Sequence, residues 1–254
     1  MLEESIRQQR QSKPILLMTH LVLGFPSFEE NMKAIDAMSD AGVELVELQI
    51  PFTEPVADGP VILKANSDSI KNGTKVKECF AFASEVAQKF PGIQFLLMTY
   101  YNIVFTNGQG DFISKAKKSG VKGFIIPDLP PEEGESWLKD CEDHRLENIF
   151  IFTPMNTSER LKAIASYAKG FVYCVGRRGV TGSKTSFDEN IAKQISRYRS
   201  VTRLPLAVGF GVREKADVEF LRDKADIAVI GSKLIDLQIN EGTSAIRDFL
   251  RTLR

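Results

Sequence analysis

Two acidic residues, Glu47 and Asp58, lie at the end of an apolar segment and in the loop after it. Glu47 stands among aliphatic residues in the run VELVELQI (43–50), where burying a carboxylate is costly unless it has a partner or a task. The loop PFTEPVADGP (51–60) contains three prolines and an Asp58-Gly59 turn, so it can return Asp58 toward Glu47. Two carboxyl groups in different environments can divide acid and base roles. Alternatively, Glu47 is a paired structural acid and Asp58 belongs to an Asx turn.

Glycine-bearing turns follow three apolar segments in the C-terminal half. They read GRRGVTG (176–182), GFG (209–211) and GS (231–232), and the last runs directly into KLIDL. Glycines let backbone N–H groups approach a phosphate closely, and a helix N-terminus adds favourable partial charge. The turns therefore favour a phosphate site, although tight turns need glycines for structural reasons as well.

Eight short apolar segments must position these residues. They are rich in Ile, Val, Leu and Phe with little strict alternation, which is typical of parallel strands buried on both faces. We expect strands at 15–23, 43–50, 93–100, 122–127, 148–154, 170–175, 204–210 and 226–231. Segments at helical spacing separate them, and several end in a glycine, as helix C-caps do. We expect helices at 28–42, 75–90, 111–120, 132–145, 158–170, 186–199 and 213–225, and a final helix after Thr243.

The regular alternation of strand and helix predicts the α/β class with a parallel sheet. Eight units favour a closed (β/α)8 barrel, the TIM barrel, whereas five or six would favour an open doubly wound sheet. The 254 residues match the usual length of such a barrel, and no linker divides them. We therefore expect a single barrel domain over residues 1–254. Its active site should lie at the C-terminal strand ends, and a phosphate commonly binds after strands 7 and 8.

Composition argues against several partner classes. Lys and Arg total 33, as do Asp and Glu, so charge gives no reason to expect binding to nucleic acid or to an anionic membrane. No apolar run approaches the ~20 residues that span a bilayer. The charged N-terminus MLEESIRQQRQSK lacks the apolar region of a secretory signal. We expect a cytoplasmic protein.

Cysteine and histidine are too sparse and scattered to predict a metal site. Cys79, Cys141 and Cys174 show no paired spacing, which fits a reducing compartment better than a disulfide scaffold. The two histidines are His20 and His144, and neither stands near a cysteine cluster. His20 ends the first strand and should face the barrel mouth. We expect no metal.

Several motifs together resemble those of the tryptophan synthase alpha subunit family, over nearly the whole chain. The most specific is ELVELQIPFTEPVADGP (44–60). The others follow in the family's order and are LMTYYNIVFTNG (97–108), IIPDLPPEE (125–133), GRRGVTG (176–182), AVGFGV (207–212) and VIGS (229–232). Each motif is weak alone, but the ordered set is specific.

The resemblance implies a lyase of tryptophan biosynthesis that cleaves indole-3-glycerol phosphate to indole and glyceraldehyde 3-phosphate by a retro-aldol reaction. Glu47 matches the acid–base that protonates indole C3 and assists deprotonation of the glycerol hydroxyl. Asp58 matches the carboxylate that contacts the indole N–H. Thr181 matches the residue that engages this aspartate on loop closure. The substrate-binding positions implied by the resemblance are Tyr100, Tyr173, Thr181, Gly182, Phe210, Gly211, Gly231 and Ser232.

The resemblance also implies how the chain is assembled and supplied. No cofactor is expected in this chain, because the protonated indole ring is the electron sink. Pyridoxal phosphate is expected in a partner beta subunit, within an alpha–beta–beta–alpha complex. Loop 51–60, the PDLPP segment and the barrel mouth would contact that partner.

Five positions depart from the family pattern, of which Thr53 and Glu54 replace a usual Ser-Asp pair and keep its chemical character. Gln49 stands where a glycine is usual, and its amide could hydrogen-bond Glu47 or crowd the substrate. His20 replaces a common apolar aromatic residue, and Phe25 replaces a frequent aspartate. They keep two alternatives open: a phosphate-binding barrel enzyme acting on another substrate, or an allosteric partner subunit with little activity of its own.

Overall fold

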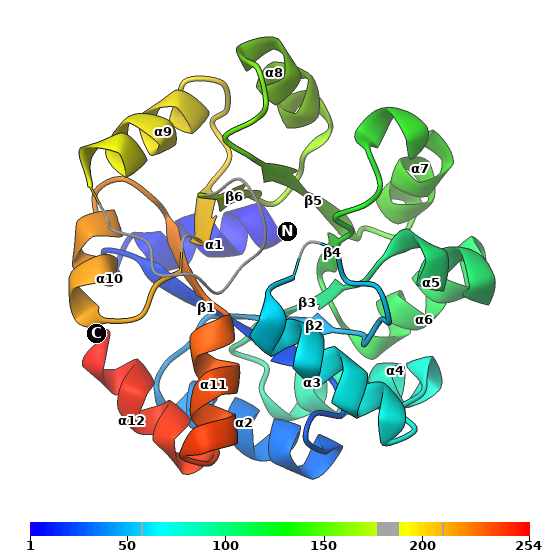
Figure 1. Cartoon of the computed structure of the whole chain (residues 1–254). Helices are drawn as coiled ribbons and strands as arrows, with labels where there is room; N and C mark the ends of the chain where they lie inside the picture. The colour runs from blue at the N-terminus through cyan, green and yellow to red at the C-terminus, as the bar shows by residue number, and fades with distance from the viewer. Residues whose placement is uncertain (57, 177–187, 210) are drawn as a thin grey trace.

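The chain folds into a closed barrel of eight parallel strands in sequential order, as the sequence predicts (Figure 1). The computed structural model describes residues 1–56, 58–176, 188–209 and 211–254. The strands are β1 Leu16–Val22, β2 Leu45–Gln49, β3 Gln94–Met98, β4 Gly123–Ile125, β5 Glu147–Phe152, β6 Val172–Val175, β7 Leu206–Gly209 and β8 Ile227–Ile230. β8 pairs with β1 and closes the ring. The predicted fold class is thereby confirmed.

Helices surround the barrel. Those that correspond to predicted segments are α2 Phe28–Asp40, α4 Val76–Lys89, α6 Gln109–Ser119, α7 Glu135–Asp143, α8 Ser158–Tyr167, α9 Glu189–Arg199, α10 Lys215–Leu221 and α12 Ser244–Thr252. A 3-10 turn at Pro131–Glu133 precedes α7. The sequence did not predict α1 Leu2–Arg10, α3 Pro60–Lys71 or α5 Tyr101–Asn107, and α11 Ser232–Asn240 is the short helix that follows β8. The unpredicted α3 and α5 follow β2 and β3 at the barrel mouth, so they shape the site.

Strand β2 places Glu47 inside the barrel. Successive strand residues point to opposite faces. Leu45 belongs to the cluster that fills the barrel interior, whereas Val46 and Leu48 belong to the shell between strands and helices. Glu47 and Gln49 share the inner face with Leu45, and both are buried.

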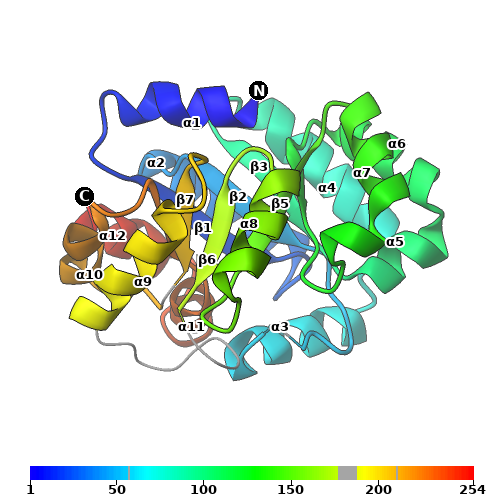
Figure 2. The ribbon, with the colours of Figure 1, turned by 90° about the horizontal axis from the view of Figure 1, so that it is seen from above.

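Helix α1 closes the N-terminal end of the barrel. Its Leu2 and Ile6 pack into the interior cluster. The Leu2 backbone N–H donates to Glu147 Oε1 at 2.9 Å, which ties the helix to the start of β5. Figure 2 shows α1 across one end of the barrel and α3 and α11 at the opposite end. A substrate therefore has to enter from the end that carries α3 and α11.

Buried amides fix the first two loops at that open end. Asn31 accepts a hydrogen bond from the Gly24 backbone at 2.7 Å and donates to the Phe25 carbonyl at 2.8 Å. Asn66 accepts from the Phe52 backbone at 2.9 Å. Because these amides satisfy backbone groups that the strands leave unpaired, the loops after β1 and β2 have defined paths.

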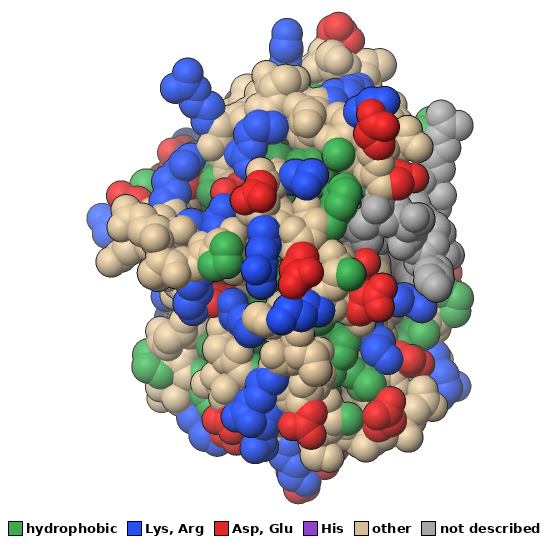
Figure 3. Space-filling view, turned by 90° about the vertical axis from the view of Figure 1, so that its left-hand side faces the viewer, with side chains coloured by type: hydrophobic (Ala, Val, Ile, Leu, Met, Phe, Trp, Pro, Cys, Tyr) green, Lys and Arg blue, Asp and Glu red, His purple; other side chains and the backbone are tan. Residues whose placement is uncertain are grey.

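The surface carries mixed charge. On the face in Figure 3, Lys and Arg side chains are interspersed with Asp and Glu, without a broad patch of one sign. None of the helices in the described ranges has the length and apolar character needed to cross a membrane.

We predict that Gly24→Ala destabilises the protein more than Gly73→Ala. Both glycines have positive φ, +75° and +86°, so each alanine incurs a left-handed backbone cost of ~1–2 kcal/mol. A Cβ at Gly24 would also lie 2.1 Å from Thr74 Oγ1, whereas one at Gly73 would meet nothing within 4 Å. Such an overlap typically costs ~1–3 kcal/mol more. Urea unfolding measures the difference, and equal losses of stability would contradict the packing account.

Candidate active site

His20 and Glu47 form a buried pair on adjacent strands. The register of β1 against β2 sets His20 directly beside Glu47. His20 Nδ1 lies 3.4 Å from Glu47 Oε1, and the two residues are only 4 % and 3 % exposed. His20 Nε2 and Glu47 Oε2 have no hydrogen-bond partner among the residues that the structure describes. One oxygen of Glu47 is thus oriented by histidine, and the other is unsatisfied within the described ranges.

The surroundings of His20 act on its pKa in two directions. Burial lowers the pKa because it disfavours the charged imidazolium. The Glu47 carboxylate, with smaller contributions from Asp58 and Gln49, raises it, and the balance is a raised pKa. The pair is therefore disposed to share a proton.

Gln49 and Asp58 form a second buried contact. Gln49 Nε2 donates to Asp58 Oδ2 at 2.7 Å, so the loop after β2 does return Asp58 toward the barrel interior. The Gln49 amide nitrogen therefore binds Asp58, and not Glu47, which was one of the two alternatives that the sequence left open. Glu47 and Gln49 project from the same face of β2, but the Gln49 amide nitrogen points to Asp58 in the loop. Gln49 Oε1 has no partner in the described ranges.

Burial also shifts the ionisation of Asp58. Desolvation raises the pKa of its carboxyl group, and the Glu47 charge adds to this. The His20 charge and hydrogen bonds from Gln49 and Tyr100 oppose the shift without cancelling it. The Tyr100 ring is buried and stacks on Phe52 at 4.9 Å between centroids. Tyr100 is thus brought to the aspartate.

Tyr173 reaches the same interior from β6. Burial, together with the charges of Glu47 and Asp58, raises the pKa of its hydroxyl well above the ordinary value, so it stays protonated. Its ring leans on Gly209 of β7: a Cβ there would lie 2.9 Å from Tyr173 Cε1 and 3.1 Å from its hydroxyl oxygen. The sequence predicts Gly209 as part of the GFG turn, and the structure shows that the missing side chain of Gly209 also makes space for the Tyr173 ring. A glycine inside an apolar strand was the available signal.

The predicted phosphate-binding residues are described only in part. Gly211 has φ +84°, which glycine adopts readily. Gly231 is the N-cap of α11, and Ser232 is its first residue. A Cβ on Gly231 would lie 3.7 Å from His20 Cβ, so the start of α11 lies beside the His20–Glu47 pair. Thr181, Gly182 and Phe210 lie outside the described residues.

Phe25 has a packing role. It is buried in a small cluster with Val22, Ile62, Ala65 and Ile235, which come from β1, α3 and α11. This cluster joins the two helices that flank the open end of the barrel. Phe25 therefore takes part in holding α3 and α11 together.

Metal-ligating side chains do not gather in the part of the chain that the structure describes. No group of three His, Cys, Asp or Glu side chains there could hold an ion. All three cysteines are free and buried. Burial raises the pKa of the Cys79 and Cys141 thiols to about 12, which makes them poor ligands at neutral pH.

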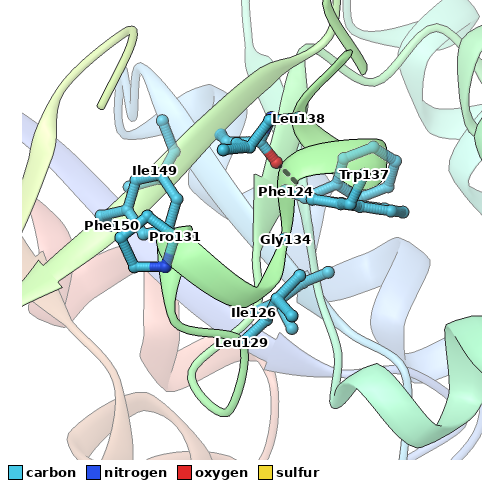
Figure 4. Close-up of a pocket in the computed structure, with 10 residues that line it drawn as sticks. Phe124, Ile126, Leu129, Pro131, Gly134, Trp137, Leu138, Ile149 and Phe150 are labelled. Atoms are coloured by element: carbon cyan, nitrogen blue, oxygen red, sulfur yellow. Dashed lines mark hydrogen bonds between the residues drawn. The ribbon is translucent and has the colours of Figure 1, made fainter. Parts of the chain in front are cut away.

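An apolar hollow lies away from these groups, outside the barrel wall. Figure 4 shows it between β4, β5 and α7, lined by Phe124, Trp137 and Ile149 among others. Its one polar lining residue, Asn148, already accepts a hydrogen bond from Trp137 Nε1 at 2.6 Å. The hollow offers nothing to a phosphate or a reacting proton, so the site is the barrel interior near Glu47.

Comparison with known proteins identifies the family. The family model described as "Tryptophan synthase alpha chain" matches residues 6–252. The chain belongs to the tryptophan synthase alpha chain family. It is 52 % identical to the tryptophan synthase alpha chain of Desulforapulum autotrophicum, over all of both chains.

Solved structures agree. The structure of Mycobacterium tuberculosis tryptophan synthase matches with a TM-score of 0.92 and 30 % identity, over 99 % of this chain and 96 % of that one. The tryptophan synthase a2b2 complex of Pyrococcus furiosus matches with a TM-score of 0.87 and 30 % identity, over 94 % and 97 %. The predicted family is confirmed, and with it the class of enzyme, a lyase that cleaves indole-3-glycerol phosphate in tryptophan biosynthesis.

We predict that Asp58→Asn becomes progressively more stable, relative to the unsubstituted alpha chain, as pH rises. The folded-state pKa of Asp58 is raised, so the native state binds its proton more tightly than the unfolded state does. Ionisation therefore costs native stability as pH rises through the folded pKa, and asparagine removes that cost.

Urea unfolding of both proteins at several pH values from 3 to 8 measures this. The difference should be smallest at the acid end. A difference that is constant, or that reverses sign, would contradict the raised pKa.

Proposed function

We propose that Glu47 and Asp58 carry the lyase reaction of this alpha chain inside its barrel. The observation that supports this most directly is that both carboxyl groups are buried, with Glu47 3 % and Asp58 5 % exposed, beside the same His20 side chain. Glu47 Oε2 has no partner among the described residues, so it is the oxygen available to exchange a proton with substrate.

Glu47 performs both proton transfers. It delivers a proton to indole C3, which makes the ring an iminium ion, and it removes a proton from the glycerol hydroxyl on the adjoining carbon. The bond between C3 and that carbon then breaks, its electrons neutralise the iminium nitrogen, and the carbon becomes the aldehyde of glyceraldehyde 3-phosphate. A positioned proton transfer typically contributes ~10²–10⁴-fold to a rate.

Asp58 stabilises the positive charge that develops on the ring. Its carboxylate is held by Gln49 Nε2 at 2.7 Å and contacts Tyr100, so it is oriented before substrate binds. A preorganised negative group in a poorly solvated site stabilises a transient cation effectively. The indole N–H is the donor that Asp58 would accept. Tyr173, held protonated beside both acids, would pack against the ring.

The phosphate would bind across the barrel mouth from Asp58. Gly211, Gly231 and Ser232 follow β7 and β8, where barrels commonly bind phosphate. The start of α11 offers unpaired N–H groups and a positive dipole end. Thr181, Gly182 and Phe210 complete the proposed substrate-binding set by resemblance.

The reaction needs no cofactor in this chain. The protonated indole ring accepts the electrons of the broken bond, which is the task that a cofactor would otherwise perform. In this family, pyridoxal phosphate belongs to the beta subunit. We propose that this chain follows that division, acts in the cytoplasm, and folds as one domain over residues 1–254.

A beta subunit is the partner that the family supplies. The Pyrococcus furiosus relative is an a2b2 complex, and we propose the same assembly here. Three large apolar side chains are exposed in the segments that follow strands β2, β3 and β5: Val56 at 74 % in the loop after β2, Phe105 at 73 % in helix α5, and Met155 at 59 % in the turn after β5. Exposed apolar groups on one face indicate an interaction surface.

The family match favours this reaction over the two alternatives left open by the sequence. An enzyme acting on another phosphorylated substrate would release no indole. An allosteric subunit without chemistry would activate a beta subunit but show no lyase turnover. Steady-state indole release, with and without the beta subunit, separates the three.

We predict that Glu47→Gln lowers indole release from indole-3-glycerol phosphate by at least ~10²-fold while the protein stays folded. The amide keeps the shape of the side chain but cannot cycle a proton. Glu85→Gln, an exposed change on α4, is the control and should retain full activity. A folded Glu47→Gln protein with normal turnover would refute the assignment.

We predict that Phe105→Glu weakens beta-subunit binding at least ~10-fold and leaves the intrinsic lyase rate of the free chain within about twofold, because it places a charge in an apolar contact. Tyr167→Glu is the control: Tyr167 ends α8 and is 45 % exposed, away from the barrel mouth. Isothermal titration measures both affinities. Equal affinities for the two variants would place the contact elsewhere.

A further inference from the structure

His20 is a buried titratable group that the reaction, as described so far, does not use. It projects into the barrel from β1, with Nδ1 3.4 Å from Glu47 Oε1. Its other nitrogen has no hydrogen-bond partner among the described residues. A core histidine with a purely structural role normally satisfies both nitrogens. The unsatisfied nitrogen of His20, beside the reacting carboxyl group, therefore indicates a role other than packing.

The barrel interior contains two acidic groups and needs a positive charge to offset them. Glu47 from β2 and Asp58 from the following loop are both buried, and two desolvated negative charges in one cavity repel each other. Tyr173 from β6 is protonated and carries no charge to offset them. On the other side of His20 lies the backbone of Gly231, the residue between β8 and α11, which carries no charged side chain. An imidazolium at position 20 is the group placed to offset the acids.

We propose that His20 is a positioning residue for Glu47, and that the two side chains share a single exchangeable proton, which the pair holds at the start and at the end of each lyase cycle. This rests on the proposed function of Glu47. In the resting site the proton lies on either partner, as an imidazolium with a carboxylate or as an imidazole with a carboxylic acid.

The proton count closes over one turnover. The pair gives its proton to indole C3 through Glu47 and is left as a neutral imidazole beside a carboxylate. The carboxylate then takes the proton of the glycerol hydroxyl as the carbon–carbon bond breaks and the aldehyde forms. The pair regains one proton, so no external acid or base is consumed.

Two further observations support the pairing. The hydrogen bond from Gln49 gives Asp58 Oδ2 a partner of its own, whereas the described ion-pair contact of His20 is with Glu47. The pKa of His20 is raised despite complete burial, chiefly because the Glu47 carboxylate outweighs desolvation.

Histidine NMR tests the pair without requiring turnover. The chain has two histidines, so the spectrum contains two Cε1–H signals, and His144→Gln assigns them. We expect His20 to titrate above the free value of ~6.5, and Glu47→Gln to lower its midpoint by about one unit or more. Glu85→Gln is the control and should leave it unchanged. A His20 midpoint that does not move in Glu47→Gln would overturn the proposal.

The pH dependence of kcat tests the role in catalysis. His20→Asn retains a side-chain N–H donor near the Nδ1 position but cannot titrate. We expect KM within about twofold of the unsubstituted value and an alkaline limb of kcat that shifts to lower pH, because the carboxyl group alone then holds the proton. A uniform loss at every pH, or an unchanged profile, would show that His20 is only structural.

The two experiments keep the two proposals apart. If the unsubstituted chain releases no indole, the proposed function fails, and the NMR titration still decides whether His20 and Glu47 share a proton. If the chain is active and His20→Asn has an unchanged pH profile, the lyase assignment stands and the positioning role fails. Should His20→Asn not fold, His20→Gln offers the donor from the Nε2 position for the same measurement.

Discussion

The site depends on burying two carboxyl groups inside an otherwise apolar barrel. An isolated buried carboxylate is expensive, and the structure offsets that cost with a separate partner for each acid. Glu47 has His20 beside it on the neighbouring strand, and Asp58 has the amide of Gln49. These contacts leave Glu47 Oε2 without a partner among the described residues. This is the oxygen that we propose exchanges a proton with the substrate.

The described part of the fold closes one end of this interior, which leaves the entrance at the other. Helix α1 places Leu2 and Ile6 into the opposite end of the barrel, so substrate cannot approach from there. At the entrance, Phe25 belongs to a small apolar cluster that joins α3 to α11. Helix α3, which follows the loop that carries Asp58, and α11 are therefore packed against each other.

Sequence reasoning located the strands well, because residues buried on both faces leave an unbroken apolar run. It placed Glu47 and Asp58 near each other for sound reasons, strand alternation and a proline-stiffened loop. It missed α3, since a helix that begins at Pro60 directly after a turn shows little apolar periodicity. It left the partner of the Gln49 amide open and did not name Asp58, because sequence shows which strand face a residue occupies but not how far a flexible side chain reaches. The His20–Glu47 contact depends on the register between β1 and β2, which spacing along the chain does not specify.

The account's central claim is that one interior holds both acids around the indole ring while the phosphate lies at the β7–β8 side. A crystal structure of the Glu47→Gln variant with indole-3-glycerol phosphate bound tests this directly. It should place residue 47 within hydrogen-bonding reach of indole C3 and the glycerol hydroxyl, Asp58 on the indole N–H, and the phosphate on the backbone of Gly211, Gly231 and Ser232. A substrate bound with its ring away from residue 47, or with its phosphate on the Asp58 side, would contradict the account.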